Sequence, residues 1–111
     1  MKWKSKVAWR KQLDEEWAEK PVLLEEIDVK GVKDLLSNQG DQLTLLNVWA
    51  TWCGPCIIEF PELVKFQRMY GQRDFGVVSI SVDRPEQESK VKEFLEDKQA
   101  AFHNYLFMES D

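Results

Sequence analysis

Residues 43–56 read Leu-Thr-Leu-Leu-Asn-Val-Trp-Ala-Thr-Trp-Cys-Gly-Pro-Cys, and no other stretch says as much about the architecture of this chain. The first eight residues form a nearly continuous apolar run, which is typical of a central strand buried on both faces. Two cysteines follow that run, and a helical pattern then continues to about residue 70, where Gly71 is a good stop. The sequence therefore predicts a strand, a short turn that carries a Cys-x-x-Cys pair, and a helix.

Strands and helices alternate on both sides of this stretch. Residues 28–38 have the apolar spacing of a short helix, and residues 75–82 suit a second buried strand. Asp83 and Pro85 open a further helix. The remaining extended segments are an edge strand or entry segment at 22–27 and a strand at 101–107. Because strands alternating with helices imply crossover connections, we expect an α/β fold with a mostly parallel central sheet flanked by helices.

Length and composition indicate one domain with its own core. The chain has 111 residues, and 43% of them are hydrophobic. Its net charge of −5 argues against nucleic acid as the main partner. The longest apolar run is far too short to span a bilayer, and no apolar run of the signal-peptide type follows the basic N-terminus. We therefore expect no signal peptide within this sequence.

Residues 1–21 are expected to form an N-terminal arm ahead of the domain, which we place at 22–111. Trp9, Leu13 and Trp17 recur every four residues, so a helix here would have one apolar face. Such a helix either docks on the domain or frays, and Pro21 ends the segment. The basic residues that begin the arm either contact a membrane surface or an acidic partner, or stay solvated.

The cysteine pair has the setting of a redox centre. Cys53 lies at the start of the predicted helix, where free N–H groups and the helix dipole should stabilise its thiolate and lower its pKa. A thiolate is the species that attacks a disulfide. Cys56 follows nearly one turn later, close enough to form a disulfide with Cys53, and suits a more buried resolving thiol. Gly54 permits the tight backbone between them, and the fixed φ of Pro55 suits the first helical turn.

Two other interpretations of the cysteines are weaker. They could be structural, or they could be half of a zinc site, but zinc takes about four ligands in proteins. The sequence has no second Cys-x-x-Cys, and its single histidine, His103, is distant from the pair. We therefore expect a redox-active Cys53–Cys56 disulfide that works without a metal or an organic cofactor.

Glu59 is a candidate proton carrier for Cys56. It comes three residues later, on the same face of the predicted helix, where a carboxyl group could exchange a proton with the thiol. The alternative is a solvated surface residue, although apolar neighbours on both sides favour partial burial. Pro61 lies inside this helix and should kink it, because proline removes a hydrogen bond and crowds the preceding turn.

The run from Leu46 to Cys56 resembles the active site of thioredoxin-like proteins, which share W-C-G-P-C, here beginning at Trp52, and a helix-kinking proline that Pro61 matches. The segment Glu59-Phe60-Pro61 is more similar still to the TlpA/ResA-like branch of bacterial thiol–disulfide reductases. The resemblance covers about residues 40–100. It implies a reductase that takes electrons from an upstream thiol protein and reduces disulfides of partner proteins through the CGPC motif. It also implies an extracytoplasmic location, periplasmic or membrane-anchored.

One departure from the family concerns the buried acid. Thioredoxins proper place an aspartate six residues before the first cysteine, whereas this sequence has Asn47, whose amide cannot accept a proton. In the TlpA/ResA-like branch the acid is instead the glutamate that Glu59 matches. The resemblance therefore supports a proton role for Glu59.

The other departure concerns the C-terminal part. The family fold continues through a cis-proline loop, two antiparallel strands and a last helix, whereas this sequence stops at Asp111, and none of its four prolines suits that loop. We therefore expect a domain that is incomplete at the C-terminus, in which the strand at 43–50 lacks one neighbour. Because a bare apolar edge invites pairing with another chain, self-association or a longer source protein is expected.

Two rival functions remain open at this point. A peroxiredoxin-like peroxidase would use one cysteine against peroxide and would need an activating arginine, and the adjacent cysteine pair argues against it. A non-catalytic thioredoxin-fold binding module would keep the fold without efficient thiol exchange. The absent cis-proline segment, which forms much of the family's substrate groove, favours that second rival for the chain as it stands.

Overall fold

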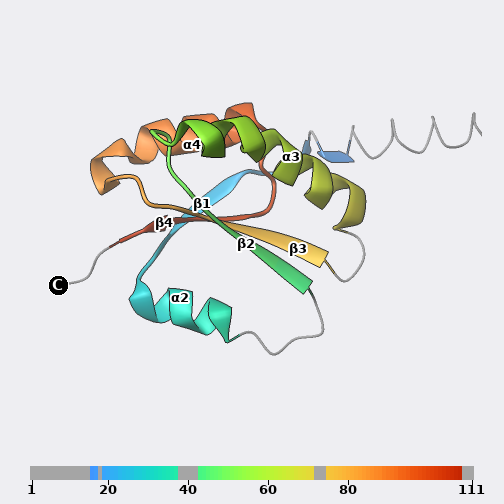
Figure 1. Cartoon of the computed structure of the whole chain (residues 1–111). Coiled ribbons are helices and arrows are strands. Elements are labelled where there is room, and N and C mark those ends of the chain that lie inside the picture. The colour runs from blue at the N-terminus through green and yellow to red at the C-terminus, as the bar shows by residue number, and fades with distance from the viewer. Residues whose placement is uncertain (1–15, 18, 38–42, 72–74, 109–111) are drawn as a thin grey trace, which may run out of the picture.

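The strands of this chain form one parallel sheet in the order β1-β4-β3-β2 (Figure 1). A computed structural model describes residues 16–17, 19–37, 43–71 and 75–108. In chain order the elements are β1 (Leu23–Ile27), α2 (Val29–Leu36), β2 (Leu43–Trp49), α3 (Gly54–Tyr70), β3 (Phe75–Ser81), a 3-10 turn (Pro85–Gln87), α4 (Glu88–Asp97) and β4 (His103–Phe107). The predicted α/β fold with a parallel sheet is therefore confirmed.

The most buried strand lies inside the sheet, between two neighbours. β3 is the most buried strand, and it pairs on one side with β2 and on the other with β4. Asn47 of β2 lies opposite Ser79 of β3, and Ser79 lies opposite Asn104 of β4. β1 pairs with β4 alone within the described sheet, so the expectation of an edge strand near residues 22–27 is confirmed.

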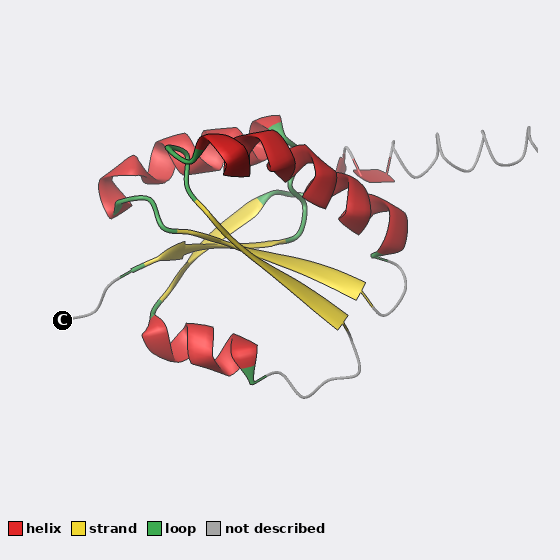
Figure 2. Ribbon diagram, in the orientation of Figure 1, coloured by secondary structure: helices red, strands yellow, loops and turns green. Residues whose placement is uncertain are grey.

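Helices cover the two faces of the sheet unequally. Figure 2 shows α3 and α4 side by side on one face, whereas α2 lies alone on the other. The core forms beneath α3 and α4, where Trp49 packs against Phe60 and Phe94 with ring centroids 4.8 and 5.1 Å apart. Val64, Val91, Leu95 and Leu106 complete much of this cluster. Burial of these large apolar side chains stabilises the packing of α3 and α4 on the sheet.

Helix starts and stops agree with the local sequence. Asp28 caps α2 by accepting a hydrogen bond from the Gly31 N–H at 2.8 Å. Gly71 ends α3, as predicted, and its N–H donates to the Gln67 carbonyl at 2.8 Å. The segment opened by Asp83 begins as a 3-10 turn, and regular α-helix starts only at Glu88.

A strand forms at 43–49, and within the described residues it lacks one neighbour, as the sequence predicted, but the prediction that it is buried on both faces is wrong. β2 lies at an edge of the described sheet and pairs with β3 alone. Leu43 and Val48 are 70% and 56% exposed, whereas Trp49 is 1% exposed because it faces α3 and α4. Because side chains alternate along a strand, Leu43 shares the helix-covered face with Trp49 and Val48 lies on the other face, so neither face of β2 is buried along its whole length. An apolar run does not state how many neighbours a strand has.

The end of the N-terminal arm docks on the domain. Trp17 is buried within the core cluster, and its Nε1 donates to the Gln99 carbonyl at 2.7 Å. Gln99 has a φ of 55°, a left-handed conformation that turns its carbonyl after the end of α4. Trp9 and Leu13, the other members of the predicted apolar face, lie outside the described residues.

Candidate active site

The turn between β2 and α3 ends at Cys53, at the carboxyl end of the parallel strands, and Cys56 follows in the first turn of α3. Ala50 is buried, and its carbonyl accepts a hydrogen bond from the Cys53 N–H at 3.1 Å, which closes a four-residue turn. Trp52 sits at the corner of this turn and is 74% exposed. The turn therefore brings Cys53 from a buried strand end to the accessible start of a helix.

Cys53 and Cys56 form a disulfide, with Cα atoms 5.3 Å apart. Cys53 is the N-cap residue of α3, and its carbonyl accepts the Ile57 N–H at 3.1 Å. Both cysteines are half-buried, but only Cys56 is among the residues that pack against the core cluster. When the pair is reduced, the sulfur of Cys53 lies where the free N–H groups of a helix N-terminus favour an anion.

The residues around the pair take the places that the sequence indicated, with one exception. Gly54 and Pro55 form the exposed first turn of α3, and Pro61 lies inside that helix. Asn47 is half-buried on β2. The exception is Glu59, which the sequence suggested is partly buried and which is exposed. Its apolar neighbours belong to different faces of α3, since Phe60 points into the core and Ile58 is 79% exposed.

Sequence reasoning missed Asp83, which holds the turn from below. Asp83 is 3% exposed, and its carboxylate accepts hydrogen bonds from the Thr51 N–H at 3.0 and 3.2 Å, from the Thr51 hydroxyl, and from the Ser81 hydroxyl at 2.6 Å. The Ser81 hydroxyl in turn accepts the Asp83 N–H at 3.1 Å. The available signal was an acid directly after a buried strand, at the sheet edge where parallel α/β proteins place their sites.

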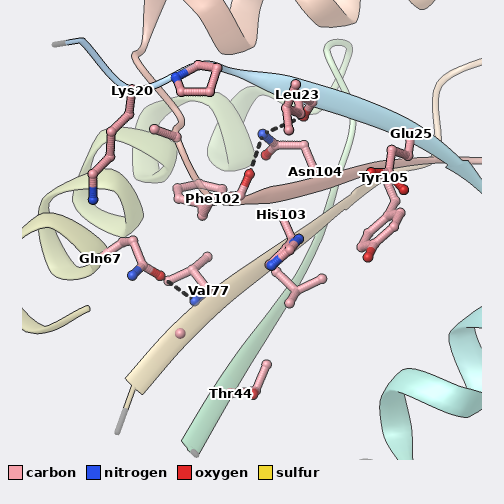
Figure 3. A pocket seen from close by; sticks show the side chains of 14 residues that line it. Lys20, Leu23, Glu25, Thr44, Gln67, Val77, Phe102, His103, Asn104 and Tyr105 are labelled. Carbon is pink, nitrogen blue, oxygen red and sulfur yellow. Dashed lines mark hydrogen bonds between the residues drawn. The ribbon is translucent and has the colours of Figure 1, made fainter. Parts of the chain in front are cut away.

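A hollow of about 420 Å³ lies at the amino ends of the strands, opposite the end that leads to the cysteines (Figure 3). Leu23, Thr44, Val77 and His103 line it near the amino ends of their strands. The Gln67 side chain accepts the Val77 N–H there at 2.6 Å, and the Asn104 amide donates to the Leu23 carbonyl at 3.1 Å. Because the cysteines follow the carboxyl end of β2, this hollow is not part of the redox site.

No three His, Cys, Asp or Glu side chains of the described residues gather as a metal site requires. Within the same residues, no helix has both the length and the apolar character needed to cross a membrane.

Comparison with known proteins gives a family match over most of the chain. The Redoxin family matches residues 14–110. The thiol-disulfide oxidoreductase ResA of Oceanobacillus iheyensis is 33% identical over 76 residues, which cover 68% of this chain and 33% of that protein. The thioredoxin-like protein YneN of Bacillus subtilis is 36% identical over 62 residues, which cover 56% of this chain and 36% of that protein. The chain thus spans about a third of the length of these relatives.

One solved structure is also similar. It is the solution structure of a putative thiol-disulfide oxidoreductase from Bacteroides vulgatus, which is 32% identical, with a TM-score of 0.46. The match covers 61% of this chain and 43% of that one.

Proposed function

Because the chain belongs to the Redoxin family, as a TlpA/ResA-like member of the thioredoxin superfamily, we propose that it reduces disulfides of partner proteins by dithiol exchange. The observation that carries the proposal is the Cys53–Cys56 disulfide, which joins the N-cap of α3 to its first turn. A disulfide in this setting is the oxidised product of such an exchange. Its reduced form would present one accessible thiolate and one resolving thiol.

The exchange takes two steps. The Cys53 thiolate attacks one sulfur of the partner disulfide, and the partner's other sulfur leaves as a thiolate. Cys56, after losing its proton, then attacks the Cys53 sulfur of the mixed disulfide and displaces the second partner sulfur. Two electrons and two protons pass to the partner in total, and the chain is left with the Cys53–Cys56 disulfide. An upstream thiol protein must return the electrons.

The surroundings of the pair support these roles. The N-cap position gives Cys53 the free N–H groups of α3, and the exposed Trp52 and Gly54 beside it leave room for a partner chain. An alanine Cβ at Gly54 would meet no atom within 4 Å, so the backbone there faces open space. Cys56 packs against the core, which suits the sulfur that acts only after the mixed disulfide has formed.

An insulin-reduction assay with dithiothreitol as electron donor tests the proposal. The chain should accelerate insulin reduction above the rate with dithiothreitol alone, and Cys53→Ser and Cys56→Ser should each abolish the acceleration. Absence of acceleration by the parent chain would favour the binding-module alternative. Turnover of hydrogen peroxide without insulin reduction would favour the peroxidase alternative.

We also propose that this chemistry takes place outside the cytoplasm, in the periplasm or on a membrane-anchored protein. Support comes from the likeness to the TlpA/ResA-like branch at Trp52 to Cys56 and at Glu59 to Pro61. Fractionation of the source cells, followed by immunoblotting, tests this location. Recovery of the protein solely with cytoplasmic markers would contradict it.

A further inference from the structure

Asp83 is the one buried carboxylate among the described residues, and it binds the turn that runs from Ala50 to Cys53. Its two oxygens accept hydrogen bonds from the Thr51 N–H, the Thr51 hydroxyl and the Ser81 hydroxyl. Thr51 and Asp83 are 32 residues apart in the sequence. A carboxylate that is removed from water needs such donors, and here two groups of a single threonine supply most of them.

A short rigid path leads from this cluster to the nucleophile. Thr51 is the first corner residue of the turn that the Ala50 carbonyl and the Cys53 N–H close. The Val82 N–H donates to the Trp49 carbonyl at 2.8 Å, so the segment that carries Asp83 is also tied to the end of β2. With Thr51 fixed at both its amide and its hydroxyl, the turn has little freedom to rotate the sulfur of Cys53.

We propose that Asp83 is a positioning residue that acts through Thr51 to align Cys53 with the N-terminus of α3. The inference rests on the proposed function, because the alignment matters only if Cys53 reacts as a thiolate. The helix N–H groups stabilise a thiolate only when the sulfur faces them, and that effect is confined to the first turn. Loosening the turn should therefore lower the reactivity of Cys53 and leave Cys56, which belongs to the helix, unaffected.

The test measures alkylation of each thiol by iodoacetamide in the reduced full chain, near neutral pH, with mass-spectrometric separation of Cys53 from Cys56. Asp83→Ala removes the acceptor, and we expect Cys53 to react roughly three- to tenfold more slowly, with the rate of Cys56 unchanged. Asp83→Asn keeps an oxygen for the Thr51 N–H, and we expect a Cys53 rate within about twofold of the parent rate.

Thr51 supplies a matched pair of variants. Thr51→Val keeps the shape and removes the hydroxyl, and we expect it to slow Cys53 in the same direction as Asp83→Ala. Thr51→Ser keeps the hydroxyl, and we expect the parent rate. If Asp83→Ala does not fold, the difference between Thr51→Val and Thr51→Ser decides the question alone.

Three results would overturn the proposal. Unchanged Cys53 rates in Asp83→Ala and Thr51→Val would mean that the hydrogen bonds do not align the sulfur. Faster Cys53 in both Asp83→Ala and Asp83→Asn would mean that Asp83 acts by its charge. Faster reaction of both thiols would mean that Asp83 serves only stability. Alkylation requires no partner protein. The alkylation rates therefore test the role of Asp83 even if the chain fails to reduce insulin, and the two failures can be distinguished.

Discussion

Cys53 and Cys56 lie within one helical turn of each other, yet their surroundings differ. Cys53 caps α3 next to exposed residues, whereas Cys56 packs against the core cluster that contains Trp49 and Phe60. This asymmetry is what separates an attacking thiol from a resolving thiol, because the helix N-terminus acts on Cys53 whereas Cys56 packs against the core.

Cys53 should therefore alkylate faster than Cys56 in the reduced parent protein near neutral pH, by about tenfold or more. Single variants, Cys53→Ser and Cys56→Ser, give the rate of each thiol without interference from the other. Cys56→Ser should in addition trap mixed disulfides with partner proteins, visible on non-reducing gels. Equal rates, or a faster Cys56, would mean that the two roles are wrongly assigned.

Glu59 remains a predicted proton carrier, although it is exposed. Glu59→Gln keeps the shape and removes the titrating group, so we expect slower insulin reduction near neutral pH and a changed pH profile for Cys56 alkylation. The fold should be intact, because an exposed helix position rarely contributes more than about 0.5 kcal/mol.

Glu62→Gln is the matched control for Glu59→Gln, because Glu62 is also an exposed residue of α3. It should leave both the insulin-reduction rate and the pH profile of Cys56 unchanged. Overlapping thiol titrations of Glu59→Gln and the parent would show that Glu59 is only a surface residue of α3.

The site was predictable from sequence where its residues are neighbours in the chain. Cys53, Cys56 and the turn between them could be read directly, because the Cys-x-x-Cys spacing and the strand–helix context are local. Asp83 could not be read in this way. Its role depends on the register of β2 against β3, which brings Ser81 opposite Trp49 and so places the next residues beneath Thr51.

For the helices and strands, the sequence predicted which segments form better than it predicted how deeply each is buried. The helix at 28–38 and the strands at 75–82 and 101–107 all form, because each has a period or an apolar run bounded by turn residues. The depth of β2 was predicted wrongly, since burial depends on which elements lie alongside a strand. The docking of Trp17 was left open, because an amphipathic pattern does not identify the surface that receives it.

Trp17 offers a stability test of that docking. Trp17→Ala removes a buried indole and its hydrogen bond to the Gln99 carbonyl, so we expect a loss of about 3–5 kcal/mol in the free energy of unfolding. Urea denaturation followed by circular dichroism measures it. Trp52→Ala is the control, because that indole is 74% exposed and its loss should cost about 0.5 kcal/mol or less. Equal effects of the two variants would contradict the docking of the arm.

At the scale of the whole molecule, the two edges of the sheet differ. β1 forms one edge of the sheet and carries the charged residues Glu25 and Glu26. Helix α2 follows β1 directly in the chain. The β2 edge instead carries Leu43, Leu45 and Val48, which are 70%, 40% and 56% exposed. Unpaired backbone groups beside exposed apolar side chains form a template for another strand, whereas charged side chains discourage such pairing.

We therefore predict that the 111-residue chain is not a stable monomer and that it self-associates through the β2 edge. Sedimentation equilibrium or light scattering, together with thermal unfolding, measures this. Val48→Lys places a charge on the edge strand and should shift the chain towards monomer, because lysine on an edge opposes strand pairing. Leu36→Lys is the control, since Leu36 is 69% exposed but belongs to α2, and it should leave the association unchanged. A monodisperse parent that melts cooperatively as a monomer would contradict this prediction and would mean that another part of the chain covers the β2 edge. That part would not be β4, which pairs with β1 and β3.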